Sequence, residues 1–502
     1  MRFVKRNRKS GGSSVIRTTD LSRGNSPLPT NFEQMIEIIS SLITSDDLQI
    51  IQIESANLVY YYLETIVDLR RLYDEIVPQF ERLTKTPDQW KMLFARGETL
   101  DKLEDVLSDL MKGNVIIAHR SWKGQVVSIP LAEIKTRAVE KPTIEKVFLG
   151  AKESFVEDLD SNVGLLRRWI KDVNLTVTYF TAGERSKSKV ALVYLRDVAN
   201  PDWVKEISTN LKKIHIDRIV GHKDLMELII RRNQTVFPLY ELTEVPVRVS
   251  YFLNQGRIAI LLDGSPFAAL LPTVMVNMLQ AAEYLDQGSI IPLFVRVIRL
   301  VSLLLALYAP ALFVALVSVN TGIIPENLGL VIASDRATVP YPLLVEVLAL
   351  FVLLDIFLES TSFVPGAIGP ALNIVGSLVI GQAAAQAHLV SRTSIIVAAV
   401  TAIGTFLTMY QLTYALRIWK YPMIFAAALL GVYGIVCCTI VMTAHLCGLK
   451  SLGVPYFSPL GPLRPGDIFN GLLWSKDISD TKERMKMWES IDKKTQDGDP
   501  DT

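Results

Sequence analysis

The sequence has few of the patterns on which enzymes and disulfide-stabilised proteins depend. It holds only three cysteines among 502 residues, all in the last apolar segment, so it has no disulfide framework. Its five histidines lack metal-ligand spacing, and neither a Gly-rich phosphate loop nor a Gly-x-Ser-x-Gly motif occurs. We therefore expect no enzyme activity, no cofactor and no metal site.

An excess of charge of one sign is also lacking, because 52 basic residues balance 51 acidic ones. The net charge of +1 gives no reason to expect nucleic acid as a partner. The opening MRFVKRNRKSGGSSVIR is basic, but no apolar run follows it, so it is not a secretory signal. We expect residues 1–30 to be a disordered tail, or one attracted to an anionic membrane, and the hydrophilic region after it to be cytoplasmic.

The hydrophilic region contains an internal repeat. LQIIQIESANLVYYYLE and LTVTYFTAGERSKSKVALVYL each predict two strands about a turn, and each is followed by a helix–Gly–strand–turn–strand unit, at Gly113 and Gly256. Asp263-Gly264 between apolar runs is typical of a hairpin. We predict two similar α+β lobes, residues 31–140 and 141–290, joined around RAVEKPTIEK.

Apolar segments gather after about Pro292, and about 20 such residues are needed to cross a bilayer. We predict an all-α polytopic membrane domain over residues 291–450 and a charged cytosolic tail over 451–502. Basic flanks favour four crossings, although five would place Arg417 and Lys420 better. The four predicted spans are Leu300–Val319, Ala367–Ala387, Ser394–Tyr414 and Met423–Leu446, and the short acidic stretch Pro342–Phe357 is re-entrant or lies at the surface.

That acidic stretch carries Glu346, Asp355 and Glu359, which are costly in a membrane unless they face water or a partner. At about 100° per residue, Glu346 and Asp355 lie on opposite sides of one helix, whereas Asp355 and Glu359 share a face. We expect Glu346 to be a pore or inter-helix group and the other two to form a vestibule pair. A tilted surface helix with solvated acids is the alternative.

The stretch GPALNIVGSLVIGQAAAQAHLVS has small residues four apart at Ser377, Gly381 and Ala385, which allow another helix to approach closely. Gln382 and Gln386 stack on one face of the same helix. We expect this face to be buried, either within the chain or at a subunit interface or polar lining.

Four motifs, in order from about residue 140 to 462, resemble the A subunits of GerA-type spore germination receptors. The motifs are GERSKSKVALVYLRDVANP, GRIAILLDGSPF, GSLVIGQAAAQAHLVS and HLCGLKSLGVPYFSPLGP. The resemblance implies a protein of the spore inner membrane that acts with a transporter-like nutrient-binding B subunit and a lipoprotein C subunit. It also implies a homo-oligomer, expected to be a pentamer, that forms a nutrient-gated cation channel.

The chain departs from the family at charged positions. Gln386 and Phe351 stand where acids are frequent, and Leu358 and Phe363 stand where bases are common, whereas Glu346 matches an acidic position, as does Asp355. This leaves open a different ion preference, or a role like that of the family's SpoVA-operon member. Another alternative is a non-conducting scaffold that relays a signal from the B subunit. A membrane enzyme acting on lipid or peptidoglycan precursors is the weakest.

Overall fold

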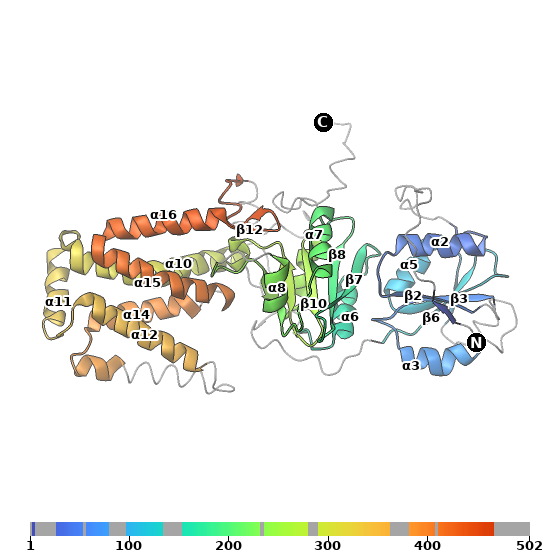
Figure 1. Cartoon of the computed structure of the whole chain (residues 1–502), viewed down its shortest axis with the longest axis horizontal. Coiled ribbons are helices and arrows are strands. Elements are labelled where there is room, and N and C mark those ends of the chain that lie inside the picture. The colour runs from blue at the N-terminus through green and yellow to red at the C-terminus, as the bar shows by residue number, and fades with distance from the viewer. Residues whose placement is uncertain are drawn as a thin grey trace. The chain divides into compact units, whose positions relative to one another are not determined.

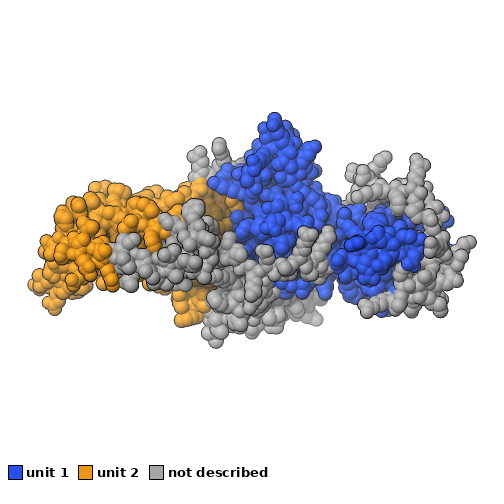
Figure 2. All heavy atoms as spheres, turned by 90° about the horizontal axis from the view of Figure 1, so that it is seen from below, with its two compact units in different colours: residues 1–232, 242–272, 482–502 blue, residues 233–241, 273–481 orange. Residues whose placement is uncertain are grey.

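The computed structural model describes residues 3–5, 27–53, 57–79, 97–133, 153–230, 235–279, 290–361, 381–406 and 410–465. The chain divides into two units, which Figure 2 colours separately. Unit 1 comprises residues 1–232, 242–272 and 482–502, and unit 2 comprises residues 233–241 and 273–481. Unit 1 contains two β-sheets with their helices, and unit 2 is mainly helical (Figure 1).

The first sheet has the strand order β1-β2-β3-β5-β6-β4 and is covered by helices on both faces (Figure 1). A hydrophobic core lies on each face of this sheet, and alternate residues of β3 contribute to the two cores because successive side chains of a strand point to opposite faces. Tyr61 packs with α2 and α5, and Tyr60 packs with the helical stretch after β3. The elements are β1 (Phe3–Lys5), α2 (Phe32–Leu42), β2 (Leu48–Ile53), β3 (Leu58–Leu63), α3 (Leu69–Arg71), η2 (Leu72–Ile76), η3 (Val77–Gln79), β4 (Glu98–Leu100), α5 (Leu103–Met111), β5 (Asn114–His119) and β6 (Val126–Pro130).

The second sheet has the order β7-β8-β10-β11-β9, and one core packs α6 and α9 against it. Its elements are α6 (Leu159–Trp169), β7 (Leu175–Ala182), β8 (Ser188–Leu195), α7 (Pro201–Lys212), α8 (His222–Ile229), β9 (Glu241–Thr243), α9 (Pro246–Asn254), β10 (Ile258–Leu262) and β11 (Ala268–Leu271).

The two sheets repeat one topology. The order β2-β3-β5-β6-β4 corresponds strand by strand to β7-β8-β10-β11-β9. Gly113 and Gly256 follow α5 and α9 with φ of +90° and +94°, which confirms the predicted left-handed helix ends. The hairpin predicted at Asp263-Gly264 is also confirmed, with Leu261 opposite Ala268. The predicted joining segment lies outside the described residues.

The N-terminal region departs from the predicted disordered tail where the structure describes it. Residues Phe3–Lys5 pair antiparallel with Ile51–Ile53 as an edge strand, which the unpaired edge of β2 makes possible. Leu28 is buried, and its amide donates to the Asp101 carbonyl at 2.8 Å. The chain is therefore packed before residue 31.

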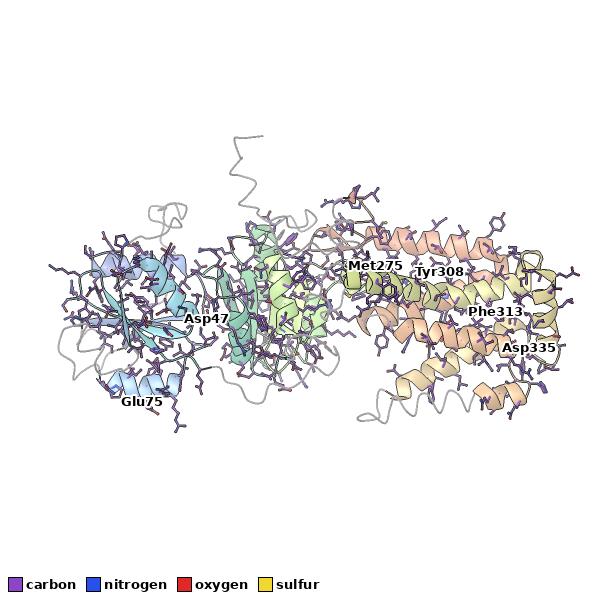
Figure 3. The ribbon with its side chains drawn as sticks, turned by 180° about the vertical axis from the view of Figure 1, so that it is seen from behind. Asp47, Glu75, Met275, Tyr308, Phe313 and Asp335 are labelled. Carbon is purple, nitrogen blue, oxygen red and sulfur yellow. The ribbon has the colours of Figure 1, made fainter. Side chains whose placement is uncertain are left out.

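Unit 2 is built around α10, which packs against α14 and α15, and α15 packs against α16. The Tyr308 hydroxyl on α10 lies 3.1 Å from Thr439 Oγ1 on α16 (Figure 3). The elements are η4 (Met275–Leu279), α10 (Ile290–Val314), η6 (Ala315–Val319), η7 (Thr321–Ile323), α11 (Glu326–Arg336), α12 (Leu343–Thr361), α14 (Arg392–Phe406), α15 (Tyr410–Leu430), α16 (Val432–Gly448), β12 (Lys450–Ser451) and β13 (Val454–Pro455).

Within the described ranges, one helical stretch is long and apolar enough to cross a membrane. It is Leu293–Val319, which contains the predicted span Leu300–Val319. The apolar helices Arg392–Thr405 and Val432–Gly448 are shorter. Most of the predicted span Ala367–Ala387 lies outside the described residues, although residues 381–386 are helical.

The boundaries of the last two predicted spans are wrong. Arg417 and Lys420, expected to lie between Ser394–Tyr414 and Met423–Leu446, are inside the single helix α15. The chain breaks instead at Gly431, whose φ is +62°. A Cβ at Gly431 would lie 2.0 Å from Asn320 Oδ1, which accepts a hydrogen bond from the Val432 amide at the start of α16. The break therefore requires glycine, which a hydropathy pattern does not reveal.

The C-terminal region is likewise packed beyond the predicted boundary at residue 451. Strands β12 and β13 form an antiparallel pair in which Ser451 lies opposite Val454. Ser451, Val454 and Tyr456 are buried. The first residues of the predicted tail are therefore packed against the rest of unit 2, and residues 466–502 lie outside the described chain.

Candidate functional site

Glu346 is buried at the junction of three helices, with 1% of its surface exposed. Its Oε1 accepts hydrogen bonds from the amide and the hydroxyl of Ser391, both at 2.7 Å. Arg336 at the end of α11 places its Nε 3.6 Å from Oε2. These contacts compensate a buried carboxylate, which would otherwise be strongly destabilising. Glu346 thus joins α11 and α12 to the residue before α14.

A second carboxylate, that of Asp335, caps the start of α14. Asp335 on α11 accepts hydrogen bonds from the amide and the hydroxyl of Thr393, at 3.0 and 3.1 Å, and Figure 3 labels it in unit 2. The first turn of a helix leaves amide groups without intrahelical partners and carries a partial positive charge. Two acids at the start of α14 therefore fix its position against α11 and α12.

Asp355 lies at the centre of a group of charged residues between α12 and α15. Lys420 Nζ lies 3.1 Å from Asp355 Oδ2, Arg417 Nε lies 3.9 Å from Asp355 Oδ1, and the Tyr421 hydroxyl donates to the same carboxylate. Arg417 also reaches Glu359, at 3.8 Å. We call Asp355, Glu359, Arg417 and Lys420 the charge cluster. Its two acids balance its two bases.

Exposure differs along the charge cluster. The side chain of Lys420 is 4% exposed, that of Asp355 is 20% exposed, and that of Glu359 is 51% exposed. Phe351, where the family often has an acid, is buried with its ring 4.6 Å from the Lys420 ammonium. A cation–π contact therefore stands beside the ion pair at this position.

The contacts separate the predicted acids as helix geometry requires. Glu346 faces α11 and α14, whereas Asp355 and Glu359 share Arg417 on α15. Glu346 is not solvated, as a surface helix would require. The basic partners Arg417 and Lys420 were not predicted from the sequence. The sequence does contain a signal for this pairing. Two acids four residues apart, Asp355 and Glu359, and two bases three residues apart, Arg417 and Lys420, each lie on one face of an apolar helix, so the two helices can pair their charges.

The predicted helix interface presents its polar residues to the outside of the single chain. Gln382 and Gln386 are exposed, and Ala385 is half-buried, while Ser377 lies outside the described residues. A Cβ at Gly381 would meet Ile395 Cγ2 at 3.7 Å, which is an ordinary contact. No packing in the described chain requires glycine at this position.

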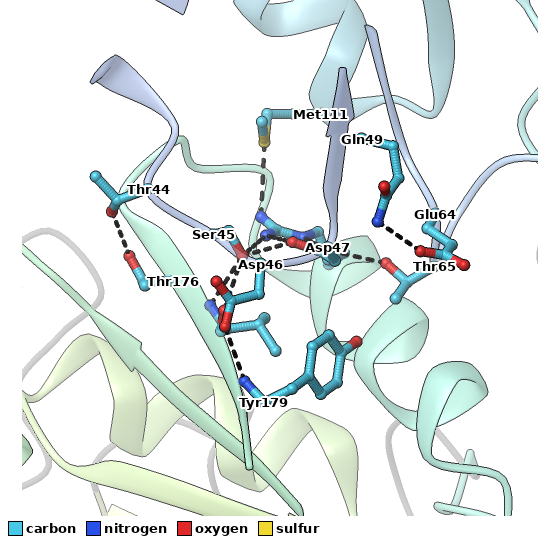
Figure 4. Close-up of polar contacts among 12 residues, drawn as sticks. Thr44, Ser45, Asp46, Asp47, Gln49, Glu64, Thr65, Met111, Thr176 and Tyr179 are labelled. Carbon is cyan, nitrogen blue, oxygen red and sulfur yellow. Dashed lines mark hydrogen bonds and ion pairs between the residues drawn. The ribbon is translucent and has the colours of Figure 1, made fainter. Parts of the chain in front are cut away.

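A buried ion pair in unit 1 was also missed. Arg167 on α6 binds Asp47 through Nε at 2.9 Å and Nη2 at 2.7 Å, and both side chains are 0% exposed (Figure 4). Thr65 also donates to Asp47, and Ser45 Oγ accepts from Arg167 and from the Val177 amide. Burial alone would raise the pKa of Asp47, but Arg167 and the hydroxyl donors hold it below its usual value.

This ion pair links residues 120 positions apart, so no local pattern could have indicated it. The segment before β2 also pairs with the edge of β7, because the Asp46 amide donates to the Val177 carbonyl at 2.8 Å. Among the described residues, no group of three or more His, Cys, Asp or Glu side chains could hold a metal ion.

Comparison with known proteins gives consistent results. The sequence profile described as "Bacillus/Clostridium GerA spore germination protein" matches residues 31–490. The chain is 32% identical to spore germination protein KA of Bacillus subtilis over 89% of this chain and 82% of that protein. It is 32% identical to spore germination protein GerLA of Bacillus cereus over 86% of this chain and 90% of that protein. It is 30% identical to the uncharacterized membrane protein YfkQ of B. subtilis over 81% of each chain.

A solved structure is also similar to this chain. It is the N-terminal domain of the A subunit of the Bacillus megaterium spore germinant receptor GerK3, at 25% identity and a TM-score of 0.37. The match covers 50% of this chain and 99% of that one.

Proposed function

Since the chain belongs to the GerA family of spore germination proteins, we propose that it is the A subunit of a nutrient-sensing germinant receptor. We propose further that several copies form a nutrient-gated cation channel. The observation that carries this proposal is the charge cluster on α12 and α15, because ionisable side chains in apolar helices are retained mainly where they face water, a partner or an ion path.

The graded exposure of the charge cluster suits the mouth of an ion path. Half-exposed Glu359 concentrates cations, and Asp355 is the next carboxylate inward. A cation that reaches Asp355 competes with Lys420 for its oxygens, so separation of α12 from α15 would control access. Glu346 is bonded within the chain, which supports its inter-helix role rather than its pore role.

We propose that the copies meet through the face of Gly381, Gln382, Ala385 and Gln386, with Ser377 on the same face. Its exposed amide side chains support this role, because they would lack partners against lipid. The assembly is a homo-oligomer with a pentamer as the expected form. Its partners are a transporter-like nutrient-binding B subunit, a lipoprotein C subunit and membrane lipid. The helical unit lies in the spore inner membrane, and the N-terminal region is cytoplasmic.

Substitution of Asp355 tests the channel role. Asp355→Asn leaves Lys420 as an uncompensated buried cation beside the path, so nutrient-triggered cation release from spores should slow by about tenfold or more at equal protein level. Glu326→Gln, which removes an exposed acid at the start of α11, is the matched control and should leave release unchanged. Unchanged release in both Asp355→Asn and Glu359→Gln would refute the vestibule role.

A non-conducting scaffold that relays a signal from the B subunit is the second candidate. It is favoured by one observation: each acid of the predicted set has a basic partner within the chain, so none needs a permeating ion. In this case Asp355→Asn would lower the stability of the helical unit, and the purified complex in liposomes would pass no ions under any ligand. The family's SpoVA-operon type of role remains the third candidate, in which the chain amplifies ion release.

A further inference from the structure

The segment after α16 binds both stretches of chain that connect to the second sheet in sequence. The fully buried hydroxyl of Ser451 donates to the Leu239 carbonyl at 2.8 Å and accepts from the Thr273 amide at 3.1 Å. Leu239 is two residues before β9, and Thr273 is two residues after β11. The Ser451 side chain therefore binds both the residues just before β9 and the residues just after β11.

Tyr456 adds a second connection. Its amide donates to the Leu449 carbonyl and its carbonyl accepts from the Met275 amide, both at 2.9 Å, and Figure 3 labels Met275 at the start of η4. Its ring is fully buried, with its centroid 6.3 Å from that of Phe237. The stretches around residues 237 and 275 are thus fixed to the same short segment.

Phe237 also reaches the membrane helices. Its ring centroid lies 6.3 Å from that of Trp419 on α15 and 6.1 Å from that of His445 on α16. His445 Nε2 lies 3.0 Å from Thr235 Oγ1. Trp419 lies between Arg417 and Lys420 in sequence, so α15 directs these two bases toward the acids of α12 and an aromatic ring toward Phe237.

We propose that residues 449–461, here called the clasp, hold the stretches 235–241 and 273–279 of unit 2 in place against α15 and α16. A displacement of Leu239 or Thr273 then moves Ser451, and a displacement of Phe237 moves Trp419 and with it the neighbouring bases Arg417 and Lys420. Coupling of this kind travels through packed side chains and buried hydrogen bonds. Ser451 is the positioning residue, because it bonds both stretches.

Hydrogen exchange on the full-length protein in detergent tests whether the clasp holds these stretches. Ser451→Ala should speed exchange of the Thr273 amide by roughly fivefold, since the one bond that this amide loses contributes about 1 kcal/mol. Thr235→Val keeps the side-chain shape but removes the oxygen that accepts from the Phe237 amide at 3.1 Å and lies 3.0 Å from His445 Nε2, so it should speed exchange at Phe237. Ser334→Ala, which removes an exposed hydroxyl on α11, is the control. Unchanged exchange in both variants would overturn the proposal.

The coupling role rests on the proposed channel function and needs a second measurement. In spores with normal receptor level, Ser451→Ala should raise the nutrient concentration for half-maximal cation release by about tenfold or more, whereas Ser334→Ala should not. Faster exchange with an unchanged nutrient response would overturn the coupling. Failure of the wild-type complex to pass ions would refute the channel alone, because the exchange result would still decide whether the clasp exists.

Discussion

Removal of the Arg167 guanidinium should destabilise unit 1 far more than removal of its sequence neighbour. Arg167→Met leaves the Asp47 carboxylate fully buried with only hydroxyl donors, and a buried pair broken on one side costs about 3–5 kcal/mol. Arg168→Met breaks an ion pair with Glu153 at 2.8 Å, but Arg168 is 44% exposed, so its cost should be about 0–1 kcal/mol. The pair's stabilisation is present above the unfolded pKa of Asp47 and is lost as pH falls below about 4.

Hydrogen exchange at the slowest amides of β3 and β8 in the full-length protein measures this cost. At about 1.4 kcal/mol per factor of ten, Arg167→Met should speed exchange by about a hundredfold or more. The double variant Arg167→Met with Asp47→Asn should recover about 2 kcal/mol, because no charge is left buried. A loss below about 1 kcal/mol in Arg167→Met, or additive costs in the double variant, would refute the reasoning.

The remaining predictions concern one titratable side chain and one glycine. Burial lowers the pKa of His222 to about 4, so between pH 7 and pH 5 the unfolded state binds a proton that the folded state does not. The free energy of unfolding should therefore fall by about 2 kcal/mol from pH 7 to pH 5. Thermal unfolding at the two pH values measures this loss, and His222→Gln should abolish it. Gly431→Ala should cost at least about 2 kcal/mol in the melting of the detergent-extracted protein, because its Cβ would collide with Asn320. Gly448→Ala meets open space, and equal melting of the two variants would contradict this.

Local patterns were sufficient for much of unit 1. Gly113 and Gly256 mark helix ends because only glycine adopts their left-handed backbone without strain, and this requirement is visible in the sequence. The turn Asp263-Gly264 likewise determines the pairing of β10 with β11. Such features depend on residues a few positions apart.

The contacts of unit 2 were less predictable from the sequence, because its charged and polar side chains have partners that are far away along the chain. Lys420 pairs with Asp355 over 65 positions, and a hydropathy pattern read alone assigned Lys420 to a loop. Ser451 reaches Leu239 over 212 positions, so a segment assigned to a charged tail is in fact buried. In both cases the partner, rather than the local sequence, determines where a polar residue can lie.

We propose that this chain forms a nutrient-gated cation path controlled by the charge cluster. Cation flux into liposomes that contain the purified protein with the proposed B and C subunits, measured with and without the nutrient mixture that triggers the spores, tests this directly. We expect flux that depends on nutrient and is slowed by Asp355→Asn but not by Glu326→Gln. Absence of flux under every nutrient condition, in a complex that retains its oligomeric state, would contradict it.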